Sequence, residues 1–208
     1  MATLSLLRSF GLLLVGFVSC TSPDAKQKLG IPIVGAETQV VLESLIQHDS
    51  LALSSSGSSG RPILSQLAPL GLIVQAPVDT GFLHTTIRLD SVTLRSLLRL
   101  KYLDGFFFTS QDSLALIQQA QQQQMARFDT TRLAPSDWLS PQALERQKKQ
   151  QEERPYYRFS QPLFSSDSSR AYLLFDYHCI GCGGGVAYLV ERKDGVWQPV
   201  GWRRRWIN

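Results

Sequence analysis

The residues of this sequence best suited to chemistry are Cys179 and Cys182, which stand in the stretch YHCIGCGGGVAYLV at positions 177–190. A C-x-x-C pair can be a redox centre, part of a zinc site or a disulfide that closes a turn, and its surroundings decide between them. Thioredoxin-type pairs lie at a helix N-terminus, where backbone dipoles lower the pKa of the first thiol. Here three glycines and a strand-like pattern follow Cys182. We therefore expect a local disulfide, with redox catalysis as the alternative.

His178 stands next to Cys179 and raises the question of a zinc site. A structural zinc ion needs four ligands, and only His48 and His84 could complete the set. Adjacent residues of a strand point to opposite faces, which makes His178 and Cys179 poor candidates for the same ion. Attached haem requires a histidine directly after the second cysteine, a position that Gly183 takes. We expect no metal and no cofactor.

Two carboxylates of the C-terminal region, Asp176 and Glu191, are expected on neighbouring strands and could form an acid–base pair. Charged residues on the exposed face of a hairpin are the more ordinary interpretation. The G-x-S-x-G motif of serine hydrolases is absent from the sequence. The sequence therefore predicts no catalytic residue.

The C-terminal stretch WQPVGWRRRWIN combines tryptophans with consecutive arginines. As a strand it would place Trp202, Arg204 and Trp206 on one face. The other face would carry Arg203, Arg205 and Ile207. The first face is a candidate binding surface, because indole and guanidinium groups can stack on bases or sugars or contact anionic lipid, although tryptophans more often cover a core. The net charge of +4 is too small for a dedicated nucleic-acid binder, so no nucleic-acid partner is expected.

The N-terminal residues 1–19 have the organisation of a signal peptide. Arg8 precedes an apolar run over residues 10–18, which is too short to span a bilayer as a helix. The small residue Ser19 and then Cys20 follow this run. The polar stretch after Cys20, punctuated by Pro23, Gly30 and Pro32, is typical of a flexible tether over residues 20–35.

The tetrapeptide FVSC at positions 17–20 resembles the lipobox of bacterial prolipoproteins, with Phe17 where leucine is usual. This resemblance implies cleavage before Cys20, acylation of Cys20 with lipids such as palmitate, and anchoring to a membrane of the bacterial cell envelope. The protein would then face the periplasm or the cell exterior. If Cys20 carries lipid, Cys179 and Cys182 are the two cysteines that remain, in a compartment where disulfides persist.

Helical spacing of apolar residues predicts helices over 36–48 and 91–103. The sequence TSQD at 109–112 has the spacing of a capping box and should open a helix over 113–128. Pro141 after Ser140 should begin another helix, which Pro155 ends. The stretches 71–75 and 84–89 are expected as short strands.

From position 156 onward the pattern alternates, which predicts strands over 157–164, 170–178, 186–193 and 196–207, with a tight turn at Asp194 and Gly195. Helices before strands indicate the α+β class. We expect one domain over 36–208, in which a mainly helical part (36–155) packs on an antiparallel meander of about four strands (156–208). The segment 160–200 resembles the closing segment of a group of uncharacterised bacterial secreted proteins and lipoproteins, which implies no activity.

Taken together, these patterns predict an exported, membrane-anchored bacterial lipoprotein with a binding or envelope-structural role. The alternative is an extracytoplasmic thiol-disulfide oxidoreductase that uses Cys179 and Cys182. The expected partner is the membrane, through the lipid anchor, and the sequence identifies no protein or glycan ligand. The disulfide, Cys20 and the surface of Trp202, Arg204 and Trp206 are the predicted sites.

Overall fold

The residues after position 170 build the centre of the fold, because apolar side chains at consecutive positions point to both faces of a strand. The computed structural model describes residues 31–48, 61–75, 90–132, 138–152 and 154–207, all within one compact unit. Three long strands form an antiparallel meander in it, at the places that the alternation predicts, except that the second strand begins at Cys182, four residues earlier than expected. They are β11 (Arg170–Cys179), β12 (Cys182–Lys193) and β13 (Val196–Ile207).

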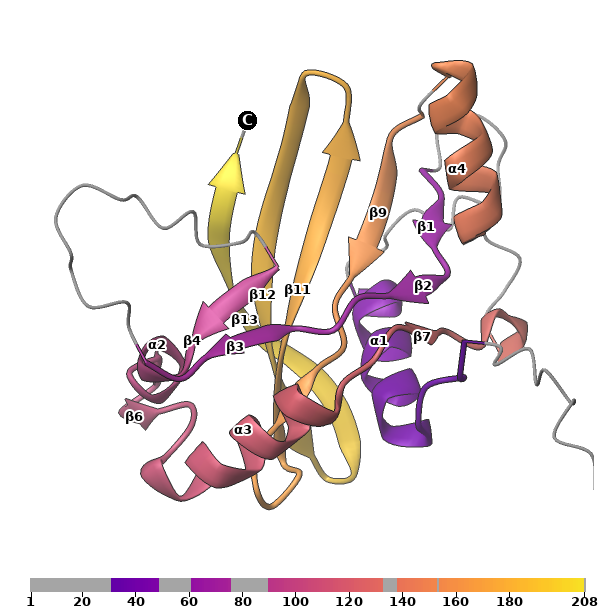
Figure 1. Ribbon diagram of the computed structural model, residues 1–208. Helices are drawn as coiled ribbons and strands as arrows, with labels where there is room; N and C mark the ends of the chain where they lie inside the picture. The colour runs from indigo at the N-terminus through magenta and orange to yellow at the C-terminus, as the bar shows by residue number, and fades with distance from the viewer. Residues whose placement is uncertain (1–30, 49–60, 76–89, 133–137, 153, 208) are drawn as a thin grey trace, which may run out of the picture. The chain divides into compact units, whose positions relative to one another are not determined.

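These strands belong to a seven-stranded mixed sheet with the order β13-β12-β11-β9-β1-β8, while β10 pairs with β11 (Figure 1). β9 (Tyr156–Phe159) and β10 (Leu163–Phe164) are antiparallel to β11. β1 (Ile63–Leu64) is parallel to both β9 and β8 (Trp138–Leu139). The sheet therefore joins strands that lie about a hundred residues apart, and β13 forms one of its edges.

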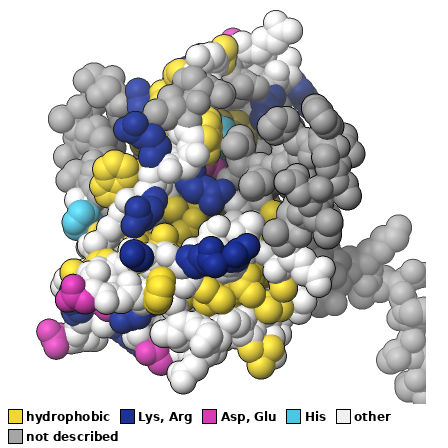
Figure 2. Space-filling model, turned by 90° about the vertical axis from the view of Figure 1, so that its left-hand side faces the viewer, with side chains coloured by type: hydrophobic (Ala, Val, Ile, Leu, Met, Phe, Trp, Pro, Cys, Tyr) yellow, Lys and Arg dark blue, Asp and Glu magenta, His cyan; other side chains and the backbone are white. Residues whose placement is uncertain are grey.

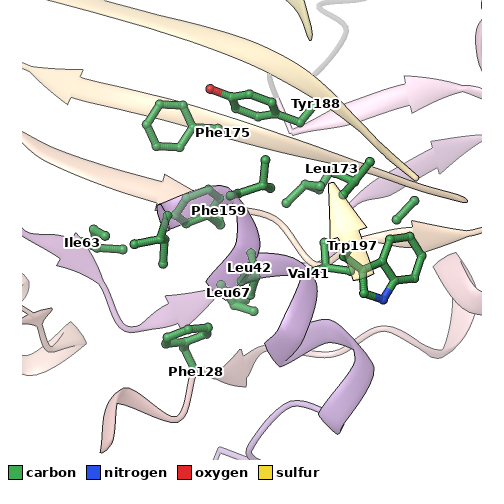
Figure 3. Close-up of a cluster of buried hydrophobic side chains, with 14 residues drawn as sticks. Val41, Leu42, Ile63, Leu67, Phe128, Phe159, Leu173, Phe175, Tyr188 and Trp197 are labelled. Carbon is green, nitrogen blue, oxygen red and sulfur yellow. The ribbon is translucent and has the colours of Figure 1, made fainter. Parts of the chain in front are cut away.

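Helix α1 (Ala36–His48) covers one face of this sheet. Its buried residues Val41 and Leu42 lie among Leu67, Leu173 and Trp197 (Figure 3). The same cluster contains Phe159, Phe175, Tyr188 and Val190. We call this side of the sheet the α1 side.

The start of α1 is also held by polar contacts with the β12–β13 hairpin. The Glu37 carboxylate accepts hydrogen bonds from Trp197 Nε1 at 2.6 Å and from Arg192 Nη1 at 3.0 Å. Two turns further along, Ser44 Oγ donates to the backbone oxygen of Trp197 at 2.6 Å. These contacts fix α1 against the edge of the sheet.

The opposite face is covered by short elements around a second apolar cluster that contains Leu70, Phe107, Phe108, Leu116, Tyr172 and Leu174. They include the parallel pair β3 (Gly71–Ile73) and β4 (Ser91–Thr93), helix α2 (Leu94–Leu98), the hairpin of β5 (Lys101–Tyr102) and β6 (Gly105–Phe106), and helix α3 (Ser113–Gln122). Separately, β2 (Gln66–Leu67) pairs with β7 (Ala126–Arg127), and α4 (Pro141–Gln150) buries Leu144 against Leu64 and Leu139. Two 3-10 turns complete the described elements, η1 (Ser110–Asp112) and η2 (Thr130–Arg132).

The glutamine-rich end of α3 has a structural role that composition does not predict. The side chain of Gln119 bonds both backbone groups of Phe164, accepting from its N–H at 2.8 Å and donating to its oxygen at 2.9 Å. Gln123 likewise accepts from the N–H of Leu70 at 2.7 Å and donates to the oxygen of Pro162 at 2.8 Å. A carboxamide can do this because it carries a donor and an acceptor side by side. These glutamines therefore satisfy backbone groups of segments that are distant in the chain and fix α3 against them.

The prediction of a mainly helical part on a four-stranded antiparallel meander is wrong. The stretch 36–155 contains the strands β1 to β8 among its short helices, and two of them, β1 and β8, extend the main sheet in parallel. The expected helix over 91–103 is reduced to α2, because the Thr93 side chain caps a helix start by accepting from the N–H of Ser96. The residues on either side of α2 pair as strands instead.

Signals that depend on neighbouring residues are confirmed. Helix α1 has the expected bounds, and the capping box joins Thr109 and Asp112 ahead of α3. Ser140 caps α4 by accepting from the N–H of Ala143 at 3.1 Å, with Pro141 directly after it. Asp194 and Gly195 form the predicted turn, both with positive φ. The strand expected at 84–89 lies outside the described residues.

Candidate functional site

Cys179 and Cys182 close the hairpin between β11 and β12. They are direct cross-strand partners, bonded through their sulfur atoms, with Cα atoms 5.2 Å apart. Between them the chain turns over Ile180 and Gly181, and Gly181 adopts a φ of +68° that favours glycine. Both cysteines lie at strand ends, so neither has the helix N-terminus that acidifies the thiol of a thioredoxin-type pair.

Replacing both Cys179 and Cys182 with serine should lower the free energy of unfolding by at most about 2–3 kcal/mol, because so short a loop constrains the unfolded chain little. Urea unfolding of the double variant and of the reduced wild type should give the same shift. Intact mass should show the wild type two hydrogens lighter than its reduced form. Rapid turnover of insulin disulfides by the wild type would contradict this structural role.

The three glycines after Cys182 lie in β12, and two of them make a seat for an indole ring. A Cβ built on Gly183 would stand 3.0 Å from carbons of the Trp206 ring. At Gly185 a Cβ would stand 2.6 Å from Asp176 Oδ1 and closer still to Trp206 Nε1. Gly184 faces the other side, where a Cβ would meet only the backbone oxygen of Trp206, at 3.5 Å. Close packing therefore requires glycine at position 185, and at position 183 a Cβ would press on the indole ring.

Trp206 reaches over this seat to a buried carboxylate. Trp206 Nε1 donates to Asp176 Oδ1 at 3.2 Å, and Arg158 Nη2 donates to Asp176 Oδ2 at 2.8 Å. The Asp176 side chain is only 6% exposed, so both partners offset the cost of burying its charge. Asp176 therefore ties β11 to β9 on one side and to β13 on the other.

The acid–base pair considered for Asp176 and Glu191 is not formed. Glu191 is the cross-strand partner of Arg170, and Arg170 precedes Asp176 by six positions in β11. It makes ion pairs with Arg170 at 3.4 Å and Lys193 at 3.4 Å. Each carboxylate is thus neutralised separately.

His178 stacks on the ring of Tyr156, its cross-strand partner, with 4.9 Å between the ring centroids. Burial lowers the pKa of His178 below its ordinary value of 6.5, and the positive charge of Arg158 lowers it further, against the opposing charge of Asp176. The imidazole is therefore neutral at pH 7. Within the described ranges, no group of three His, Cys, Asp or Glu side chains could hold a metal ion. His84 lies outside them.

The predicted surface of Trp202, Arg204 and Trp206 is divided between two faces. Val186 pairs with Arg204 but the preceding Gly185 pairs with Trp206, so a bulge places one extra residue, Arg205, in β13. The bulge reverses the alternation after Arg204. Trp202 and Arg204 stay together on the α1 side, while Trp206 turns to the face that carries Asp176.

On the α1 side, Trp202 is 62% exposed and Arg204 is exposed as well. The same face continues across Gly184 to Tyr177, which is the cross-strand partner of Gly184. Arg61 lies over the Tyr177 ring, 4.3 Å from its centroid. We call these residues, Arg61, Tyr177, Gly184, Trp202 and Arg204, the Trp202 face. Gly184 contributes no side chain to this face.

Sequence reasoning found Trp202 and Arg204 but missed the rest of the Trp202 face. The alternation that predicts β11 and β12 could have placed Tyr177 on one face of the meander, although not opposite Gly184. Nothing local connects Arg61 with these strands, because it lies more than a hundred residues earlier in the chain. Cys20, the predicted lipidation site, lies outside the described residues.

No protein-family model matches this chain, and neither the curated proteins nor the solved structures contain a significant match to it. Among the described residues, none of the helices has the length and apolar character needed to cross a bilayer.

Proposed function

We propose that this protein is a lipid-anchored protein of the bacterial cell envelope whose folded part binds an acidic saccharide on the Trp202 face. The first half of the proposal rests on the signal-like residues 1–19 and on the lipobox-like FVSC that ends at Cys20. The second half rests on one observation: the largely exposed indole of Trp202 stands on an edge strand, two residues from the exposed Arg204.

The chemistry of these two side chains supports a charged sugar as the ligand. An exposed indole offers a flat apolar surface on which the apolar face of a sugar ring can stack. Residues two apart on a strand lie about 7 Å apart, so Arg204 can meet a carboxylate on the same or the next sugar. A guanidinium binds a carboxylate through two parallel hydrogen bonds.

The rest of the Trp202 face fits the same ligand. Gly184 adds no side chain of its own next to Tyr177, its cross-strand partner. Arg204, by contrast, pairs with Val186, two residues further along β12. Arg61 lies over Tyr177 and so offers a second cation, roughly 12 Å from the backbone of Arg204. Two cations at this distance suit a chain with a negative charge on successive units. A catalytic role has less support, because the ionisable side chains Asp176 and Glu191 are each bound to arginine.

Binding of an oligosaccharide of hexuronic acid to the full chain tests the second half of the proposal. Trp202→Ala and Arg204→Ala should each raise the dissociation constant, measured by calorimetry, at least about tenfold. Arg203→Ala is the matched control, since Arg203 lies on the opposite face, and it should change affinity less than about twofold. A neutral oligosaccharide of equal length should bind much more weakly. Equal binding of both saccharides, or equal loss in all three variants, would refute the assignment.

Metabolic labelling with an acyl probe tests the anchor. The wild type should incorporate the probe and Cys20→Ala should not, because the thiol of Cys20 is the proposed acceptor. Cys179→Ser with Cys182→Ser is the matched control and should label like the wild type. Labelling of the Cys20→Ala chain at the wild-type level would contradict the anchor.

A further inference from the structure

The hairpin of β5 and β6 presents two apolar side chains to solvent. Its turn residue Leu103 is 81% exposed, and Phe106 is 53% exposed. Leu103 also adopts a positive φ of 50°, a conformation that is unfavourable for leucine and that Gly or Asn adopt more readily. Both exposure and backbone conformation thus disfavour this residue in an isolated soluble domain.

The hairpin cannot remove these side chains from water by folding inward. Directly after it, Phe107 and Phe108 are fully buried, and Tyr102 packs edge to face on Phe107 with centroids 5.6 Å apart. The backbone is held from outside as well. Arg170 Nη1 donates to the oxygen of Phe107 at 2.8 Å, and Arg203 Nη2 donates to the oxygen of Lys101 at 3.3 Å. Leu103 and Phe106 therefore project from a fixed base.

Positive charge surrounds this apolar tip. Lys101 is the cross-strand partner of Phe106, so the two side chains lie next to each other on the same face of the hairpin. Arg203 contacts the backbone of Lys101 and is exposed. Arg99, which precedes Lys101 by two residues, is exposed as well. Asp104, in the turn itself, adds one negative charge. Figure 2, which views the side of the molecule that carries β6 and α2 in Figure 1, shows Lys and Arg side chains gathered next to hydrophobic ones.

We propose that this hairpin, residues 101–106, is a membrane-contact surface. Leu103 and Phe106 enter the boundary between head groups and acyl chains, and Lys101, Arg203 and Arg99 bind anionic phospholipid head groups. Asp104 stays among the head groups beside these cations. The contact is independent of the saccharide proposal, because the hairpin covers the face of the sheet opposite the α1 side.

The size and charge of the tip favour lipid over a protein partner. A stable protein interface buries about 800 Å² on each side and involves roughly 20 residues, which two projecting side chains do not supply. A second copy of this chain would bring like charges from the two hairpins together. A bilayer, by contrast, accepts a small apolar tip, and it attracts each nearby cation when its surface is anionic.

An environment-sensitive fluorophore at position 103 tests the contact. The full chain carrying Cys20→Ala and Leu103→Cys is labelled with a nitrobenzoxadiazole dye. Cys179 and Cys182 are bonded to each other, so the dye reacts only with the new cysteine. Vesicles of phosphatidylcholine with phosphatidylglycerol should raise the emission at least about threefold and shift it to the blue, as expected for entry into the interface. Vesicles of phosphatidylcholine alone should change it little.

Two further variants make the result decisive. Leu114→Cys, labelled in the same way, is the matched control, since Leu114 is 65% exposed on α3 and lies outside the hairpin. It should show no such rise. Lys101→Glu together with Arg203→Glu should abolish the rise at position 103. Three results would each overturn the proposal. They are an equal rise at positions 103 and 114, an equal rise with and without anionic lipid, and an undiminished rise at position 103 in the charge-reversed variant.

Discussion

Gly185→Ala is expected to lower the free energy of unfolding by about 3 kcal/mol, whereas Gly184→Ala should change it by less than about 0.5 kcal/mol. The new methyl group at position 185 would overlap Trp206 Nε1 and lie 2.6 Å from Asp176 Oδ1. Trp206 must then leave its seat, which exposes its ring and removes one hydrogen bond from a buried carboxylate. At position 184 the methyl group would make only an ordinary van der Waals contact, 3.5 Å from the backbone oxygen of Trp206.

Urea unfolding of the two single variants measures this difference, and a double-mutant cycle identifies its cause. In a Trp206→Ala background, Gly185→Ala should cost markedly less, because the indole that it displaces is already gone. Part of the loss of unfolding free energy should remain, because the new methyl group would still lie close to Asp176 Oδ1. Equal destabilisation by Gly184→Ala and Gly185→Ala would show that lost glycine flexibility, and not the Trp206 seat, governs both positions.

Asp112→Ala is expected to lower the free energy of unfolding by about 3 kcal/mol at pH 7. Asp112 is buried and joins two distant segments through its carboxylate. Oδ2 accepts from the N–H and hydroxyl of Thr109 at 2.7 and 3.1 Å, and Oδ1 accepts from the N–H and hydroxyl of Ser166 at 2.8 and 2.7 Å. Alanine removes both the capping box that begins η1 ahead of α3 and the link from η1 to the β10–β11 turn.

The same carboxylate predicts how the effect depends on pH. Burial by itself raises the pKa of Asp112, and the hydrogen bonds from Thr109 and Ser166 more than offset this, so the pKa lies below its ordinary value of 3.8. A carboxylate with a lowered pKa stabilises the fold above the unfolded pKa, and this contribution is lost as the pH falls through the folded pKa. The difference between wild type and Asp112→Ala should therefore be full at pH 7 and shrink below about pH 4.

Asp104→Ala is the matched control for this measurement, since it removes an exposed carboxylate from a turn. It should change the free energy of unfolding by less than about 0.5 kcal/mol at pH 7. Thermal or urea unfolding between pH 3 and pH 7 gives both values. A pH-independent difference for Asp112→Ala would show that its carboxylate charge contributes nothing to the fold.

Features that depend on near neighbours in the chain follow from the sequence alone. The bounds of α1, the Thr109–Asp112 capping box, the Ser140 cap and the Asp194–Gly195 turn all rest on residues within four positions of one another. The same holds for the hairpin that brings Cys179 and Cys182 together, because a turn of two residues leaves them directly opposite. Short-range backbone geometry and hydrogen bonding determine such features with little help from the rest of the fold.

Tertiary structure decided the features that depend on distant partners. The strands β1 and β8 contain only two residues each, and it is pairing across about seventy-five residues that makes them strands. The bulge at Arg205 turns Trp206 away from Trp202 and Arg204, since its indole gains a seat on two glycines and a bond to Asp176. Arg61 likewise joins the Trp202 face only through the fold. The alternation along one strand shows which residues are apolar. The face on which each side chain lies also depends on bulges and on the energy of packing against other segments.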